Sequence, residues 1–98
     1  MEIEGEFVAD VWRYDGDAAA WYFLTLPLDL ADEIRSRAEP VGFGSVRVTA
    51  TIGTTTWSTS VFPDKVSGSY VLPVKAAVRR AEQLSDGSPA QVSLAAIV

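Results

Sequence analysis

The sequence contains no cysteine and no histidine among its 98 residues. Without cysteine, the chain has no disulfide, no thiolate nucleophile and no zinc–sulfur site. Without histidine, it lacks the usual general base near neutral pH and the commonest metal ligand. Catalysis by a Ser-His-Asp or Cys-His arrangement within one chain is therefore excluded, and we expect neither a cofactor nor a metal ion.

Basic residues and long apolar runs are also scarce. Eight Lys and Arg against 13 Asp and Glu give a net charge of −5. Because binding to phosphates needs a basic surface, this balance disfavours nucleic acid as a partner, although it leaves room for a local basic patch. The apolar stretches are far shorter than the ~18 residues of a membrane-spanning helix, and the acidic N-terminus lacks the basic start of a signal peptide. We therefore expect a cytoplasmic protein with no membrane partner.

What is present suits one small globular domain covering residues 1–98. Hydrophobic residues make up 48% of the chain and charged residues 21%, and this length leaves room for a single core. The richest stretch, residues 45–84, contains β-branched strands, turns marked by glycine or proline, and a short amphipathic helix. This pattern favours a mainly β domain, a small β-barrel.

Alternation of apolar and polar residues predicts about six strands. The clearest case is residues 46–52, where Val46, Val48, Ala50 and Ile52 alternate with polar side chains. In the first strand Val8 and Trp12 interrupt an acidic face, which indicates either a bulge or cover on both faces. The predicted strands comprise residues 3–14, 20–26, 46–52, 57–62, 69–72 and 91–98.

Two short helices are predicted between these strands. The first covers residues 29–37, with Asp29 as its N-cap and the Glu39-Pro40 pair ending it. The second begins at Pro73, and Gly87 suits a left-handed cap or the turn after it. Apolar residues at helical spacing predict its buried face: Val74, Ala77, Val78, Ala81 and Leu84.

Two groups of side chains on the strands fit more than one interpretation. Glu2, Glu4 and Glu6 alternate along the first strand. They suit either a divalent-cation site or a solvated strand face that deters edge-to-edge pairing, and we favour the second. Trp21 and Tyr22 are placed either to stack a ligand or to pack in the core. The apolar strand around them favours the core.

The order of motifs resembles that of a known family. Residues 21–27 read WYFLTLP, 46–53 VRVTATIG, 57–63 WSTSVFP and 70–81 YVLPVKAAVRRA. Over nearly the whole chain, these motifs resemble the bacterial Domain of Unknown Function 1905 family. The resemblance implies a small closed double-split β-barrel of about six strands with two short α-helices, and it implies no established activity. One departure is that Gly87 precedes Ser88, where members often carry Gly-Asp.

The function we predict is a non-catalytic binding module for an anionic small molecule or an acidic partner surface. Lys75 and Arg79 lie four residues apart on one predicted helix face, with Arg80 beside them. The N-terminus of that helix would add a partial positive charge. Ser60 and Ser69 would supply hydroxyl donors if the strands bring them close. These five residues form the predicted ligand-binding site.

Other interpretations remain open. The cations of the second helix also suit a solvated face in which Arg79 pairs with Glu82 or Gln83. An enzyme would depend on paired carboxylates or on Ser60 with Lys65 or Lys75. Nothing in the spacing places the hydroxyl and a lysine together, so we expect no catalytic residues. A DNA-associated regulatory domain or a protein-interaction domain are further alternatives, and we expect a monomer or a weak homodimer.

Overall fold

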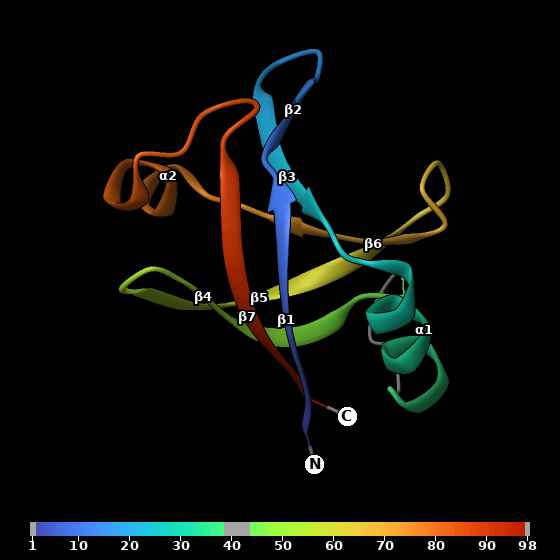
Figure 1. Ribbon diagram of the computed structural model, residues 1–98. Helices are drawn as coiled ribbons and strands as arrows, with labels where there is room; N and C mark the ends of the chain where they lie inside the picture. Colours follow the sequence, from blue (N-terminus) through green and yellow to red (C-terminus); the bar gives the residue numbers. More distant parts are fainter. Residues whose placement is uncertain (1, 39–43, 98) are drawn as a thin grey trace.

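A computed structural model describes residues 2–38 and 44–97, and in these ranges the protein is mainly β with two helices, as predicted. All strand pairs are antiparallel, and the strands form one sheet with the order β1-β7-β4-β5-β6-β3-β2 (Figure 1). The elements in chain order are β1 Glu2–Asp10, β2 Trp12–Asp15, β3 Ala20–Thr25, α1 Leu28–Arg37, β4 Val46–Ile52, β5 Thr55–Asp64, β6 Ser69–Pro73, α2 Ala76–Glu82 and β7 Pro89–Ile97.

The sheet curls into a half-barrel, so the prediction of a closed barrel of about six strands is wrong. The described residues contain seven strands, because the predicted first strand divides at Val11. The Val11 N–H donates to the Ser88 carbonyl (2.8 Å), and the Gly87 N–H donates to the Val11 carbonyl (2.7 Å). Beyond this bend β2 pairs with β3 alone, while β1 pairs with β7 alone. The two edges of the sheet are therefore consecutive in the chain but do not pair with each other.

The core fills the inside of the curl. On β4 the predicted alternation is confirmed, because Val46, Val48, Ala50 and Ile52 are all buried. The same period of two buries side chains of β5 and β7: Trp57, Val61, Val92, Leu94 and Ala96. Their neighbours along each strand face outward. Alternation therefore fixes both the strands and the side of the sheet that carries the core.

The two helices lie on opposite sides of the curled sheet (Figure 1). Helix α1 follows Pro27, and Asp29 lies in its first turn, so the prediction of Asp29 as N-cap is wrong. An added Cβ on Gly5 of β1 would lie 2.8 Å from a methyl group of Leu30. Glycine at this position therefore lets α1 approach the sheet closely. The Glu39-Pro40 pair that was predicted to end the helix lies outside the described residues, as does Val98.

Helix α2 is shorter than predicted, with seven residues. The Val74 N–H donates to the Tyr22 carbonyl (2.9 Å), so the chain stays extended past Pro73 instead of starting the helix there. The left-handed residue at its end is Gln83, with φ 55°, whereas Gly87 lies in a later turn. A helix this short gives no separate anion site at its N-terminus, so the candidate site consists of side chains and strand backbone.

Only part of the predicted apolar face of α2 is buried. Val74 and Val78 are buried, whereas Ala77 and Ala81 are exposed. The helix therefore rests on the sheet through a narrow contact. Neither of the two described helices has the length and apolar character needed to cross a membrane.

Candidate functional site

Strand β5 is paired along its length on one side only. β4 pairs with residues 55–61 of β5, whereas β6 pairs only with Phe62, Pro63 and Asp64. Beyond these residues β6 turns toward β3, where Pro73 lies opposite Phe23, and the chain continues into α2. No backbone hydrogen bond from another described element reaches residues 55–61 on the side away from β4. We call the opening between residues 55–61 and residues 73–79 the split.

A cavity of about 310 Å³ lies in the split, and we call it the α2 pocket. Trp21 and Tyr22 of β3 line one wall, and residues 57–59 of β5 line another. Lys75 and Arg79 line the wall formed by α2 and the residue before it. The volume is at the lower end of the range for small-molecule sites. Of the predicted binding residues, these two cations are brought together in one cavity.

Arg79 is held in position by two contacts. Its Nε–H donates to the Val74 carbonyl (3.2 Å), and its guanidinium carbon lies 3.7 Å from the centroid of the Tyr22 ring. A guanidinium over an aromatic face is stabilised by the ring's quadrupole. Neither contact uses the terminal amino groups, which form no ion pair with any residue that the structure describes. Those groups have the geometry that binds a carboxylate or a phosphate.

Some cations of the described ranges form ion pairs and others do not, and those of the α2 region belong to the second group together with Arg47 and Lys65. The ion pairs of these ranges are Arg13–Asp15, Arg35–Asp32 and Arg37–Glu33. Within the same ranges Lys75, Arg79 and Arg80 take part in none.

The predicted alternative partner of Arg79 is engaged elsewhere. The carboxylate of Glu82 accepts a hydrogen bond from the Thr55 hydroxyl (2.6 Å). This bond connects the end of α2 to the start of β5. Arg79 stacks on Tyr22 instead of pairing with Glu82 in the described structure. Glu82 is therefore not the ion-pair partner of Arg79.

The other predicted binding residues lie away from the α2 pocket. Arg80 is exposed and does not line it. Ser60 is half-buried, and its hydroxyl accepts a long hydrogen bond from Arg47 (3.4 Å). Ser69 is buried, and its hydroxyl donates to the Leu26 carbonyl (2.7 Å). The structure thus places the two serines in contacts that join strands and loops.

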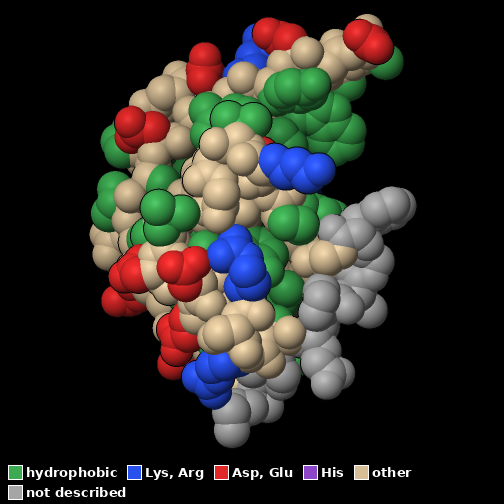
Figure 2. Space-filling view, turned by 90° about the vertical axis from the view of Figure 1, so that its right-hand side faces the viewer, with side chains coloured by type: hydrophobic (Ala, Val, Ile, Leu, Met, Phe, Trp, Pro, Cys, Tyr) green, Lys and Arg blue, Asp and Glu red, His purple; other side chains and the backbone are tan. Residues whose placement is uncertain are grey.

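Trp21 is 57% exposed, so the prediction that it packs in the core is wrong. Its neighbour Tyr22 is half-buried under Arg79. Trp21 also borders a depression of about 360 Å³ on the outside of the sheet. We call this second area the outer aromatic patch, and its other members are Tyr14, Phe23, Phe62, Val71 and Pro73. Figure 2 shows large hydrophobic side chains gathered in the upper part of the molecule, at the level of the β2–β3 hairpin in Figure 1.

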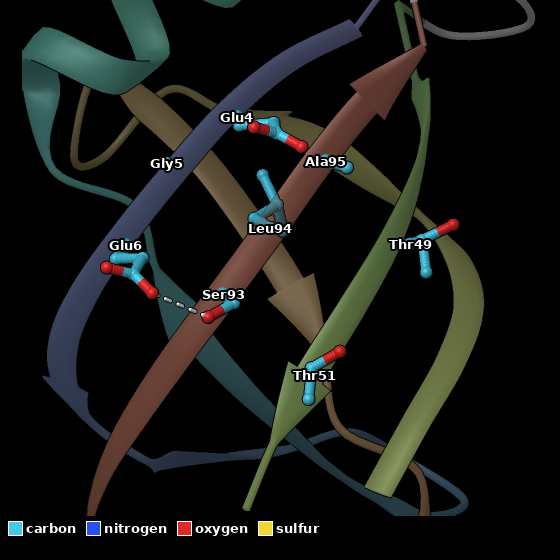
Figure 3. Close-up of a pocket in the computed structure, with 8 residues that line it drawn as sticks. All are labelled: Glu4, Gly5, Glu6, Thr49, Thr51, Ser93, Leu94 and Ala95. Carbon is cyan, nitrogen blue, oxygen red and sulfur yellow. Dashed lines mark hydrogen bonds between the residues drawn. The ribbon is translucent and has the colours of Figure 1, made fainter.

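A third depression, of about 500 Å³, lies on the outer face of β1, β7 and β4 (Figure 3). We call it the acidic depression, because Glu4 and Glu6 line it together with threonine and serine side chains. The Ser93 hydroxyl donates to Glu6 (3.1 Å). Residues 2–38 and 44–97 contain no group of three or more acidic side chains that could hold a metal ion. Glu2, Glu4 and Glu6 are exposed along this strand face.

Two hydrogen-bonded groups outside the α2 pocket have shifted pKa values. The hydroxyl of Ser67 donates to Asp64 (2.7 Å), and this bond lowers the pKa of the Asp64 carboxyl. The hydrogen bond between Arg13 and Asp15 (2.8 Å) raises the pKa of the Arg13 guanidinium. Both groups are exposed or nearly so, and each shift reflects a local hydrogen bond.

Part of the α2 pocket was not predicted from the sequence. The hydroxyl-rich residues 54–60 suit either a ligand's hydrogen bonds or a plain strand, and the strand is the interpretation that the sequence favours. Nothing in the sequence indicates that β6 leaves β5 beside Trp57, Ser58 and Thr59. The stacking of Arg79 on Tyr22 joins residues that are far apart in the chain. Only the pairing of β3 with β6 brings the two together.

Comparison with models of protein families gives a match for this chain. A family model described as Domain of unknown function (DUF1905) matches residues 7–94. The matched range contains both sides of the split and all residues of the α2 pocket. The resemblance inferred from the sequence motifs is therefore confirmed. A search of curated proteins found no match.

Proposed function

We propose that this chain, which belongs to the DUF1905 family, binds an anionic ligand in the α2 pocket without transforming it. The observation that carries the proposal is the position of Arg79. Its guanidinium is fixed against Tyr22 and the Val74 carbonyl, and its terminal amino groups are left for a ligand. Because a fixed guanidinium loses little freedom when it binds, this arrangement favours the capture of a carboxylate or phosphate.

The surroundings of Arg79 support an anion over a cation. Lys75 lines the same cavity, and Arg80 is exposed next to Arg79. The whole chain carries a net charge of −5, so three cations so close together are a local exception. The volume of about 310 Å³ favours a small molecule. An acidic side chain of a partner protein would present the same carboxylate group to this cavity as a small anionic ligand.

Titration with ribose 5-phosphate, followed by amide chemical shifts, tests the proposal. We expect shifts of the amides of residues 75–79, with an affinity in the millimolar range that is typical of one or two charge-assisted hydrogen bonds. The Lys75→Ala variant should weaken binding about fivefold. Lys65→Ala is the matched control, because it removes the same charge from the exposed turn between β5 and β6.

Two results would refute anion binding at this site. One is the absence of shifts in residues 75–79 up to about 20 mM ligand, far above the expected dissociation constant. The other is an equal loss of affinity in Lys75→Ala and Lys65→Ala, since that would indicate general attraction to positive charge.

The outer aromatic patch favours a second candidate function, that of a protein-interaction domain. Tyr14 is 56% exposed and Phe62 40% exposed, and with Trp21 they surround one depression. Large aromatic side chains that gather at the surface mark interaction sites more often than scattered ones do. Trp12, by contrast, is half-buried, packs against Phe23 in a tilted arrangement (centroids 5.0 Å apart) and donates to Thr25. The patch therefore presents Tyr14 and Trp21 more than Trp12.

Sedimentation equilibrium tests whether the patch joins two copies of the chain. A weak homodimer would show a concentration-dependent mass that Tyr14→Ser together with Phe62→Ser abolishes. A monomeric mass at all concentrations would exclude the homodimer as the use of this patch.

A further inference from the structure

We infer that the ligand of the α2 pocket is a flat heteroaromatic ring that carries a phosphate or a carboxylate. This inference rests on the proposed function and names the class of ligand for the same site. Three features of the cavity point to a ring: an exposed tryptophan at its wall, a polar strand edge facing it, and a limited volume. The first two features are independent of the two cations.

The exposed tryptophan supplies a stacking surface. Trp21 lines the α2 pocket while more than half of its surface is exposed to solvent. A second tryptophan, Trp57, lines the β5 wall and is buried. The Tyr22 ring is already covered by Arg79 at 3.7 Å, so Trp21 is the aromatic side chain available to a ligand. Any aromatic ring can stack on such a surface, whatever its substituents, because each has a π face.

The edge of β5 supplies hydrogen-bonding groups. Antiparallel strands direct their N–H and C=O groups alternately to the two sides. Residues 57–59 line the cavity and pair with β4 on one side. On the side away from β4, they have no backbone partner among the described elements. Such groups take their hydrogen bonds from water or from a ligand. A heteroaromatic ring carries donors and acceptors in its own plane, and a strand edge can pair with them.

The charged groups then fix the orientation of the ligand. Lys75 and Arg79 lie on the α2 side of the cavity, whereas Trp21 belongs to β3 and residues 57–59 to β5. A ligand that reaches all three walls needs a ring with an anionic group attached to it. A cavity of about 310 Å³ accommodates a molecule of this kind but leaves little room for a larger chain.

Matched pairs of ligands separate the contribution of the ring from that of the charge. Adenosine monophosphate is compared with ribose 5-phosphate, which has the same phosphate and sugar but no heteroaromatic base. Orotate, a heteroaromatic carboxylate, is compared with acetate. We expect at least one ring compound to bind about tenfold more tightly than its ringless partner, which is the effect of one stacked base.

Variants of Trp21 test where the ring binds. Trp21→Ala should remove the preference, so that adenosine monophosphate and ribose 5-phosphate bind with similar affinity in this variant, and Trp21→Phe should keep part of the preference. Tyr14→Ala is the matched control, because Tyr14 lies opposite Trp21 in the β2–β3 register but does not line the α2 pocket. Upfield shifts of the ligand's ring protons report stacking directly, and they should be absent with Trp21→Ala.

The outcomes separate this inference from the proposal on which it rests. The inference is overturned if neither ring compound binds more tightly than its ringless partner, or if the preference survives in Trp21→Ala. In both cases, binding of ribose 5-phosphate that depends on Lys75 would leave the proposed function standing. If none of the four ligands shifts the amides of residues 75–79, anion binding itself is refuted.

Discussion

The acidic depression and the α2 pocket are both built on strands of alternating residues, yet they differ in how completely those strands are paired. In the acidic depression β7 lies between β1 and β4 and is hydrogen-bonded on both sides (Figure 3). At the α2 pocket β5 is paired on one side only, because its pairing with β6 is limited to residues 62–64. The first region presents carboxylates and hydroxyls on a continuous surface, and the second presents cations and aromatic rings around an opening.

The difference shows where a small sheet can place a binding site. A fully paired sheet satisfies its backbone groups internally, so its outer face offers only side chains. Where a strand loses its neighbour, backbone groups, ring faces and fixed charges come together in one cavity. Stability should therefore depend mainly on the paired region, and ligand binding on the split. The following changes test that division.

The largest effect is expected in the paired region. Leu94 of β7 is 2% exposed in the core beneath the acidic depression. Leu94→Ala should lower the free energy of unfolding by about 2–5 kcal/mol, because it removes buried methyl groups and leaves a cavity. Urea unfolding measures this loss. Ser93→Ala on the exposed side of the same strand is the control and should change it by less than about 0.5 kcal/mol. Equal losses would mean that β7 does not carry the core.

A smaller effect is expected where α2 rests on the sheet. Val78 is buried, and Val78→Ala should cost about 2 kcal/mol from the two lost methyl groups and the cavity. Because Val78 positions α2, this variant should also weaken ribose 5-phosphate binding severalfold, whereas the folded fraction of Leu94→Ala should bind normally. Titration under conditions where both variants are folded measures this. Equal affinities in the two variants would contradict the division.

The next effect in size concerns the hydrogen bond that joins the start of β5 to the end of α2. Thr55→Val keeps the shape of the side chain but removes the hydroxyl that donates to Glu82. We expect a loss of about 1 kcal/mol in urea unfolding, since the bond is only partly buried. Thr56→Val, the exposed neighbour on β5, is the control, because it removes a hydroxyl that bonds to Thr51 on β4 and has no contact with Glu82. A loss no larger than that of the control would show that α2 is held without this bond.

The smallest effect concerns the end of β5 that is still paired with β6. The Ser67 hydroxyl lowers the pKa of Asp64, so this bond stabilises the folded state above the ordinary aspartate pKa. The contribution disappears as the pH falls through the lowered pKa of the folded state. Ser67→Ala should therefore lower Tm slightly at neutral pH and not at about pH 2. A difference in Tm that is the same at both pH values would contradict this assignment.

Alternation made much of the fold predictable from the sequence. Strand β4 is buried at every second residue, and the resemblance to the family is confirmed. Val8 and Trp12 indicated an irregularity in the first strand, but its division at Val11 was not predictable, because it depends on hydrogen bonds to a loop more than seventy residues away. The exposure of Trp21 was missed for a related reason. An apolar strand does not reveal whether its outer face has a partner.

The candidate site was predictable only in its local part. The spacing of Lys75 and Arg79 identified two cations that do share a cavity. The ring under Arg79 and the wall of β5 come from strand pairings that no local pattern contains. The early end of the β5–β6 pairing is set by the turn of β6 toward β3, which is a property of the whole sheet.

Hydrogen exchange of individual backbone amides tests most directly whether β5 opens into the α2 pocket. Strand β4 is paired on both sides over residues 48–52, so its amides should all exchange slowly. In residues 55–61 of β5 we predict alternation, with slow exchange for amides that face β4 and fast exchange for those that face the split. Uniformly slow exchange along residues 55–61 would mean that the strand edge is closed, and it would contradict the account.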